Sequence, residues 1–195
     1  MSYNYIMNIF FTNAHPKQCA MDHVDRHVVK MTLEYAQILS SAHRFYRGSV
    51  GVLRHPSKNI LMEEYPYVLP EEQSSHETSM YLMAHINHPC TIWARSNYLN
   101  YQWLYWLYVE LCQEYYYRYG QYHNPPKHIA NARLIDVLYD SPDGIPNTED
   151  MTPPPQCMPD EFKAASPITA YRQYIKYGKK ASLHSWKHRD PPQWW

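Results

Sequence analysis

The alternation of polar and apolar residues between positions 23 and 45 predicts a long helix with one narrow polar row. On a helix that turns by about 100° per residue, four polar side chains fall within about 80° of one another. They are His27, Lys30, Glu34 and Gln37. Apolar residues flank this row and lie across the axis: Val24, Val28, Met31, Tyr35, Ile38 and Ala42 beside it, and Val29, Leu33 and Ala36 opposite. Such a row indicates the wall of a cleft, because burying ionisable groups costs free energy unless they are paired.

A purely structural interpretation of the same row is also open. Lys30 and Glu34 are four residues apart, so they can neutralise each other on a half-exposed helix face. His27 can equally be a core histidine that hydrogen-bonds a carbonyl group. The row by itself is therefore compatible with a functional site and with a structural ion pair.

Hydrophobic spacing and helix-capping residues predict the remaining elements. Residues 7–12 form either a strand or an extended lead-in, and the first helix begins between Pro16 and Met21. Residues 46–74 contain several Gly and Pro residues, which predicts an irregular loop or lid. Further helices are predicted over His76–His85, from Pro89 to about Tyr119 with Gly120 as C-cap, over Lys127–Tyr139, and over Ile168–Tyr177 with an end at Gly178.

Residues 140–160 are rich in proline and are predicted to be an extended segment that wraps the body. The last ten residues, 186–195, are too aromatic for a loose terminus and are expected to dock on the rest of the chain. The fold class predicted from these patterns is all-α. We expect one compact helical domain over residues 1–195, with long ordered Pro-rich connections.

Composition narrows the possible functions. The chain holds 20 Tyr and 6 Trp against 4 Phe, which suits polar interfaces such as nucleic-acid grooves or a protein partner. Only 5 Gly are present, and neither the dinucleotide-binding nor the P-loop motif occurs. Equal numbers of basic and acidic residues, 18 each, argue against an affinity that rests on many phosphate contacts. DNA binding would need a local basic patch, and the last third of the chain offers one, with Arg172, Lys176 and Lys179 among its members.

The four cysteines are widely spaced and form no C-x-x-C pair. That spacing favours reduced thiols in a cytosolic protein over a disulfide framework or a zinc knuckle. The N-terminus lacks a signal-peptide pattern, and no apolar run is long enough to cross a membrane. We expect a cytoplasmic protein with no membrane contact, no cofactor and no bound metal.

Three kinds of chemistry fit the polar row. Glu34 in an apolar cleft can stabilise an oxocarbenium ion or move a proton. Lys30 can act as a Schiff-base nucleophile, although Glu34 beside it favours the ammonium form. His23 and His27 have the i,i+4 spacing of a metal site, and Glu34 or Asp25 could add a carboxylate, but the glutamate that zincins place after the first histidine is absent.

Three stretches of the chain together resemble a known family. Asp25-x-His27 is followed by Glu34, His88-Pro89 leads into a long helical pattern, and residues 167–179 carry Tyr, Lys and Gly in a closing motif. This order is similar to the phage pyrimidine-dimer DNA glycosylase/AP-lyase family of the endonuclease V type, and to uncharacterised small proteins of tailed phages. The resemblance implies an all-α enzyme in the host cytoplasm that flips a modified or damaged base out of DNA.

By matching position, the resemblance implies that Glu34 is the catalytic carboxylate and His27 a neighbour that contacts substrate. Lys30 would tune Glu34 or contact phosphate. The expected substrate-binding residues are Asp25, Gln37, His88, Arg95, Arg172, Lys176 and Lys179.

The chain departs from this family where the lyase step is concerned. The family's nucleophile is the α-amino group of its second residue, whereas the similar region here begins near Met7, behind six extra residues. Leu33 and Gln37 also stand where the family has arginines. A glycosylase that uses an activated water is therefore as compatible with the sequence as a lyase. Two further functions are open: a non-catalytic phage interaction or virion-associated protein, and a metal-dependent hydrolase that uses His23 and His27.

Overall fold

The computed structural model describes residues 7–46, 51–54, 61–64, 80–81, 83–120 and 134–195. The fold is all-α, as predicted, and the strands in the described part form one antiparallel hairpin in which Gly51 pairs with Glu64. The elements are α1 (Pro16–Asp22), α2 (Asp25–Tyr46), β1 (Gly51–Arg54), β2 (Leu61–Glu64), α3 (Pro89–Arg95), α4 (Tyr98–Tyr119), η1 (Asp160–Phe162), α6 (Pro167–Gln173), η2 (Tyr174–Gly178) and η3 (Ala181–Leu183).

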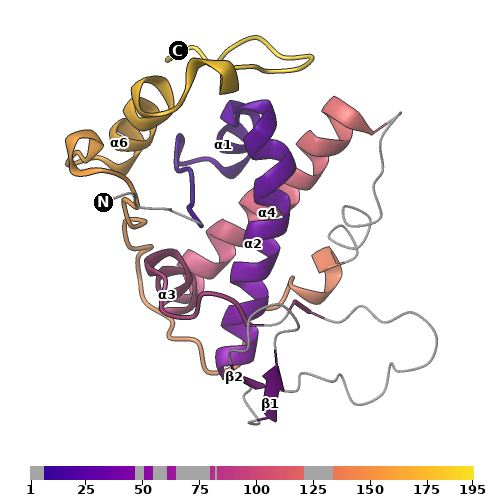
Figure 1. Cartoon of the computed structure of the whole chain (residues 1–195). Helices are drawn as coiled ribbons and strands as arrows, with labels where there is room; N and C mark the ends of the chain where they lie inside the picture. Colours follow the sequence, from indigo (N-terminus) through magenta and orange to yellow (C-terminus); the bar gives the residue numbers. More distant parts are fainter. Residues whose placement is uncertain (1–6, 47–50, 55–60, 65–79, 82, 121–133) are drawn as a thin grey trace.

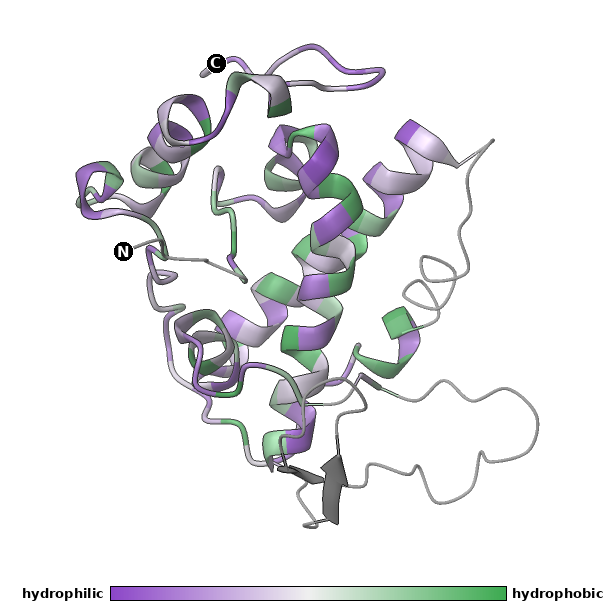
Figure 2. Cartoon of the chain, in the orientation of Figure 1, coloured by the Kyte–Doolittle hydropathy of each residue, from purple (hydrophilic) through white to green (hydrophobic). Residues whose placement is uncertain are grey.

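The two long helices, α2 and α4, cross at the centre of the molecule (Figure 1). Helix α1 packs on α4, and α3 packs on both α2 and α4. Green and purple residues alternate along α2, which matches its amphipathic sequence (Figure 2). The predicted apolar stripe is buried throughout: Val24, which directly precedes α2, and Val28, Met31, Tyr35, Ile38 and Ala42 within it.

Residues 7–12 are extended and form no strand, and all six are buried in the core. Asn8 fixes this segment against the C-terminal third, because its Nδ2 donates to the carbonyl oxygen of Cys157 at 2.9 Å. On the other side, the hydroxyl of Tyr35 accepts a hydrogen bond from the backbone N–H of Phe10. The lead-in therefore passes between α2 and the C-terminal part of the chain.

The first predicted helix is two helices, because α1 ends at Asp22 and α2 begins at Asp25. The break lies at His23, whose backbone is extended. Its Nδ1 donates to the carbonyl oxygen of Cys19 at 2.7 Å, the oxygen that a continuous helix would pair with the backbone N–H of His23. The imidazole ring thus caps the end of α1.

The predicted helix from Pro89 to Tyr119 is also broken, at Ser96 and Asn97. The side chain of Asn97 accepts from the backbone N–H of Leu99 and caps α4, which stops α3 from continuing. Gly120 is the C-cap of α4, as predicted. The last predicted helix ends at Gly178 as expected, but its final turn is a π-helix.

The predicted helix over His76–His85 is wrong for the described residues 80, 81 and 83–85, which are irregular. Side chains of α2 hold this segment by its backbone: Arg44 donates to the carbonyl oxygens of Met80 and Tyr81, and the hydroxyl of Ser41 bonds both the N–H and the carbonyl of Ala84. Residues 76–79 and 82 lie outside the described part. Of the helix predicted over Lys127–Tyr139, residues 134–137 are helical and 127–133 lie outside it.

The Pro-rich segment wraps the body, as predicted. Trp93 donates from Nε1 to the carbonyl oxygen of Thr152, and Asn100 bonds both the N–H and the hydroxyl of Thr152. The C-terminal residues dock as expected, because Trp186 and Trp194 donate to the backbone and the carboxylate of Asp22. None of the described helices is both long and apolar enough to cross a membrane.

Candidate active site

Glu34 lies on the polar row of α2 and is 7% exposed. Its Oε1 pairs with the Nζ of Lys30 at 2.7 Å, as the sequence allowed, and the lysine side chain remains 55% exposed. Its other oxygen, Oε2, is buried and has no hydrogen-bond partner among the described residues. Leaving a carboxylate oxygen buried without a hydrogen bond costs free energy, since buried polar atoms are normally paired. Such an oxygen is therefore a candidate for contact with a substrate.

Burial raises the pKa of Glu34, and the ammonium groups of Lys30 and Lys179 only partly offset this. A carboxyl group with a raised pKa can hold or exchange a proton closer to neutral pH than a solvated one. The row therefore carries a group that is suited to acid–base chemistry or to stabilising a developing positive charge.

His27 is the second member of the row with an unsatisfied atom. Its ring stacks on Phe10 with a centroid separation of 4.0 Å and an interplanar angle of 15°. Its Nδ1 is buried and without a partner within the described part of the chain. Burial, with the nearby His23 and Lys179, holds the pKa of His27 well below its usual value, so the ring is neutral at pH 7.

Lys179, which follows η2, joins this cluster from the C-terminal part of the chain. Its Nζ lies 5.6 Å from the Phe10 ring centroid and 4.4 Å from that of Tyr174, within the range of cation–π contacts. Its charge acts on both His27 and Glu34. The structure therefore brings together Glu34, Lys30, His27 and Lys179, four of the residues expected in the site.

Gln37 lies one turn after Glu34 on the same row and is half-buried. Asp25, by contrast, has a structural role. Its Oδ1 accepts from Nη1 of Arg118 at 2.9 Å and from the backbone N–H of Lys187 at 2.8 Å. The expectation that Asp25 contacts substrate is therefore not supported, because its carboxylate is occupied by the chain itself.

Arg95 does not reach Glu34, contrary to expectation. Its guanidinium stacks on Phe45 at 4.3 Å and donates to the carbonyl oxygen of Ile86. Phe45 follows Glu34 by eleven positions, which is about 16 Å along a helix axis. Arg95 thus belongs to the far end of α2.

Arg172 and Lys176 contact the docked C-terminal residues. Arg172 donates from Nε to the carbonyl oxygen of Thr12 and faces the ring of Trp194, and Lys176 donates to the main-chain oxygen of Trp195. Arg172 also lines an open hollow of about 790 Å³ that Asp22 shares. Part of the positive charge expected for a basic patch is therefore engaged by the protein itself.

The metal site considered at His23 and His27 is not supported. Both ring nitrogens of His23 are engaged, Nδ1 with the carbonyl oxygen of Cys19 and Nε2 with the hydroxyl of Tyr35 at 3.1 Å. Since Nδ1 donates to a carbonyl, Nε2 accepts from Tyr35. Burial lowers the pKa of His23 to about 4, so the ring stays neutral in this arrangement.

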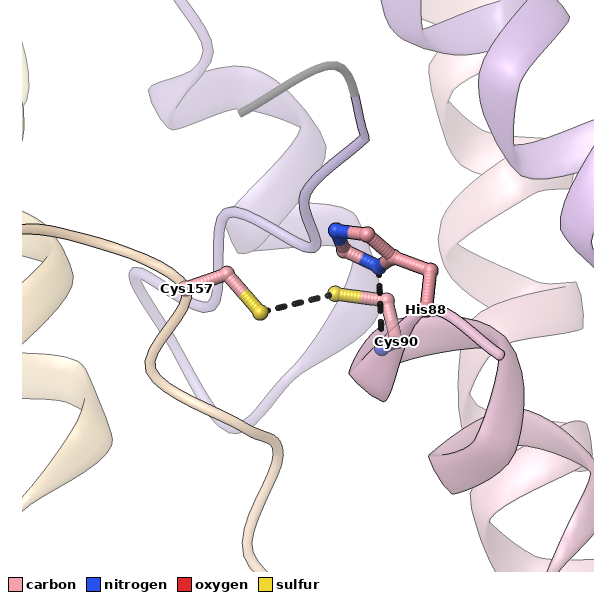
Figure 3. Close-up of side chains that lie close together, drawn as sticks. All are labelled: His88, Cys90 and Cys157. Atoms are coloured by element: carbon pink, nitrogen blue, oxygen red, sulfur yellow. Dashed lines mark hydrogen bonds between the residues drawn. The ribbon is translucent and has the colours of Figure 1, made fainter. Parts of the chain in front are cut away.

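Three other side chains meet in a way that the sequence analysis missed. His88, Cys90 and Cys157 each place a potential metal-ligating atom within 4.8 Å of the others. The two thiols face each other with a sulfur–sulfur distance of 3.7 Å, and His88 lies beside them (Figure 3). The His-Pro-Cys spacing at a helix start was the available signal, but Cys157 is 67 residues away and only the fold shows their proximity.

Large aromatic residues also occupy the surface of the described part of the chain. Those of α4 that are exposed include Trp106, Tyr116 and Tyr117, and Tyr117 donates to the carbonyl oxygen of His188. No protein-family description, curated protein or solved structure matches this chain. The geometry of the site is therefore the main guide to its function.

Proposed function

We propose that the protein hydrolyses an N-glycosidic bond to a modified or damaged base in DNA, with Glu34 as the catalytic carboxylate. The observation that carries this proposal is the buried Oε2 of Glu34, which has no partner among the described residues. The resemblance to the pyrimidine-dimer glycosylase family, which rests on Asp25, His27 and Glu34, points to the same residue.

The chemistry follows from the atoms of the row. Oε2 of Glu34 accepts a proton from a water molecule, whose oxygen bonds to C1′ of the sugar while the bond from C1′ to the base nitrogen breaks. The electron pair of that bond leaves with the base, which then takes up the proton. The negative charge of Glu34 also stabilises the oxocarbenium character of the sugar during this step.

The other residues of the row would position the substrate. Neutral His27 offers Nδ1 as a hydrogen-bonding atom next to the Phe10 ring. Lys30, half-exposed and held by Oε1 of Glu34, can contact a DNA phosphate at the rim, and Lys179 can do so from the C-terminal part of the chain. Because the Nζ of Lys30 is held by Oε1 of Glu34, a Schiff base at Lys30 is not part of the proposal.

The test is release of free base from DNA that carries ultraviolet photoproducts or modified bases, followed by mass spectrometry. We expect Glu34→Gln to lower base release by about 100-fold or more, because the amide cannot take up a proton. Glu161→Gln, at an exposed carboxylate on η1, is the matched control and should keep full activity.

Two results would contradict the proposal. One is equal base release by the wild-type protein and Glu34→Gln. The other is the absence of base release from the whole substrate panel by a wild-type protein that is shown to be folded by circular dichroism. A covalent complex of the protein with DNA, trapped by borohydride, would instead indicate that an amine of the protein is the nucleophile. Loss of that complex in Lys30→Ala would show that Lys30 supplies the amine.

A further inference from the structure

We propose that His88, Cys90 and Cys157 bind a zinc ion that links the start of α3 to the Pro-rich segment. The three side chains come from two parts of the chain, and their ligand atoms converge within 4.8 Å of one another (Figure 3). This site is separate from the proposed glycosylase chemistry and does not depend on it.

The sulfur–sulfur distance fits two thiolates on one ion. Two zinc–sulfur bonds of about 2.3 Å at a tetrahedral angle place the sulfur atoms about 3.8 Å apart. The thiols of Cys90 and Cys157 are 3.7 Å apart. A zinc ion can therefore sit between them without a change in their separation.

The imidazole of His88 needs a small rotation to complete the site. In a tetrahedral zinc complex, a histidine nitrogen lies about 3.6 Å from each thiolate sulfur. The ring is half-buried, and its Nδ1 accepts a 3.2 Å hydrogen bond from the backbone N–H of Cys90. The ligand nitrogen of His88 lies at most 4.8 Å from the sulfur atoms of Cys90 and Cys157. A ring rotation that moves this nitrogen by about 1 Å therefore brings it close to the nitrogen–sulfur separation of a tetrahedral zinc site.

The segment that carries Cys157 is held in place by buried polar contacts. Asn8 donates to the carbonyl oxygen of Cys157, and the hydroxyl of Tyr171 donates at 2.6 Å to the carbonyl oxygen of Pro155. The same hydroxyl contacts Oδ1 of Asn8. Because these contacts anchor the segment independently of Cys90, the meeting of the two thiols is built into the fold.

The donor set selects the metal. Two thiolates and an imidazole favour zinc over magnesium or calcium, which require oxygen ligands. The described residues supply three ligands, so a water molecule can take the fourth tetrahedral position. Both cysteines are buried, at 0% and 7% exposure, so the bound ion would act as a cross-link between residues that are 67 positions apart.

The experiment is metal analysis of the full chain after purification from zinc-supplemented cells without chelators. We expect about one zinc per chain, and loss of that zinc in Cys90→Ser and Cys157→Ser. Cobalt substitution should give the intense near-ultraviolet absorption of a thiolate-bound tetrahedral ion. Cys112→Ser, at a cysteine outside the cluster, is the matched control and should keep both signals.

His88→Gln covers the case in which a buried cysteine variant fails to fold, since His88 is half-buried. This variant should remain folded and bind zinc more weakly in competition with a chromophoric chelator. The proposal is overturned if the wild-type protein takes up no zinc in that titration, or if Cys90 and Cys157 form a disulfide in protein taken from a reducing cytosol. Zinc that persists in both Cys157→Ser and His88→Gln would overturn it equally.

Discussion

Glu34 and Glu114 are buried to nearly the same extent, at 7% and 4% exposure, yet their surroundings differ. Both oxygens of Glu114 are paired: Oε1 accepts from Nε of Arg118 at 2.7 Å, and Oε2 accepts from Nη2 of Arg189 at 2.7 Å. Glu34 has one paired oxygen and one without a described partner. The protein therefore supplies partners for both carboxylate oxygens of Glu114, but the described residues supply a partner for only one oxygen of Glu34.

The pKa shifts of the two glutamates have opposite signs. Burial raises the pKa of both, but the hydrogen bonds from Arg189 and Arg118 outweigh it at Glu114, so that its net pKa is lowered. At Glu34 burial prevails over Lys30 and the net pKa is raised. A buried network in which every charged group is hydrogen-bonded, as around Glu114, stabilises the fold. A buried carboxylate with an unpaired oxygen, as at Glu34, is instead a candidate substrate-binding group.

The largest effect should come from breaking the complete network at Arg118. This side chain also donates to Asp25 and to the carbonyl oxygens of Met21 and His23. We expect Arg118→Met to lower the free energy of unfolding by about 3–5 kcal/mol, because Glu114 and Asp25 lose their shared buried partner. Urea unfolding at pH 7 measures this.

The matched comparison is Lys30→Met, which removes the partner of Glu34 at an exposed position. It should lower the free energy of unfolding by about 1 kcal/mol or less, because the lysine half of the pair is 55% exposed and solvent screens its charge. Equal effects of Arg118→Met and Lys30→Met would remove the distinction between the two regions.

Acid should destabilise the protein through His23. Its pKa in the folded state is about 4 against 6.5 in the unfolded chain, so the unfolded state binds more protons between these values. The free energy of unfolding should therefore fall by up to about 3 kcal/mol as the pH drops from 6.5 to 4, with His27 adding to the same slope. Urea unfolding across this range and an NMR titration of the histidines measure it.

His15→Gln, at an exposed histidine, should leave the slope unchanged. If His23 titrates near 6.5 in the native protein, its place between Cys19 and Tyr35 is wrong.

The smallest effect is expected for Glu34→Gln. Because the folded pKa of Glu34 is raised above 4.5, ionisation of this group disfavours folding as the pH rises. The variant should therefore equal or exceed the wild-type unfolding free energy at pH 7, by at most about 1 kcal/mol, and the two should converge below pH 4.5. A clear loss of stability at pH 7 would place Glu34 with the structural carboxylates instead.

Local sequence was sufficient for much of α2. Its apolar stripe, the Lys30–Glu34 pair and the burial of His27 follow from helical periodicity, which depends only on residues a few positions apart. The breaks at His23 and Asn97 were missed because a ring or amide that caps the backbone competes with helical hydrogen bonds, and periodicity does not register this.

The longer-range parts of the site could not be predicted in the same way. Lys179 was expected near Glu34 only through a family resemblance, and its position over Phe10 depends on how η2 packs. Asp25 and Arg95 were expected to bind substrate because of their sequence positions. In the structure, the carboxylate of Asp25 accepts a hydrogen bond from Arg118, and the guanidinium of Arg95 stacks on Phe45. The pairing of Cys90 with Cys157 depends on the path of the Pro-rich segment.

Glu114 has a consequence for how the chain folds during synthesis. Its first partner, Arg118, lies one helical turn away, but its second, Arg189, is translated 75 residues later. While position 189 is still inside the ribosome exit tunnel, the nascent protein can assemble its two long helices yet carries Glu114 with half of its final partners. Glu114 therefore gains its second arginine partner only after residue 189 has been translated and has left the tunnel.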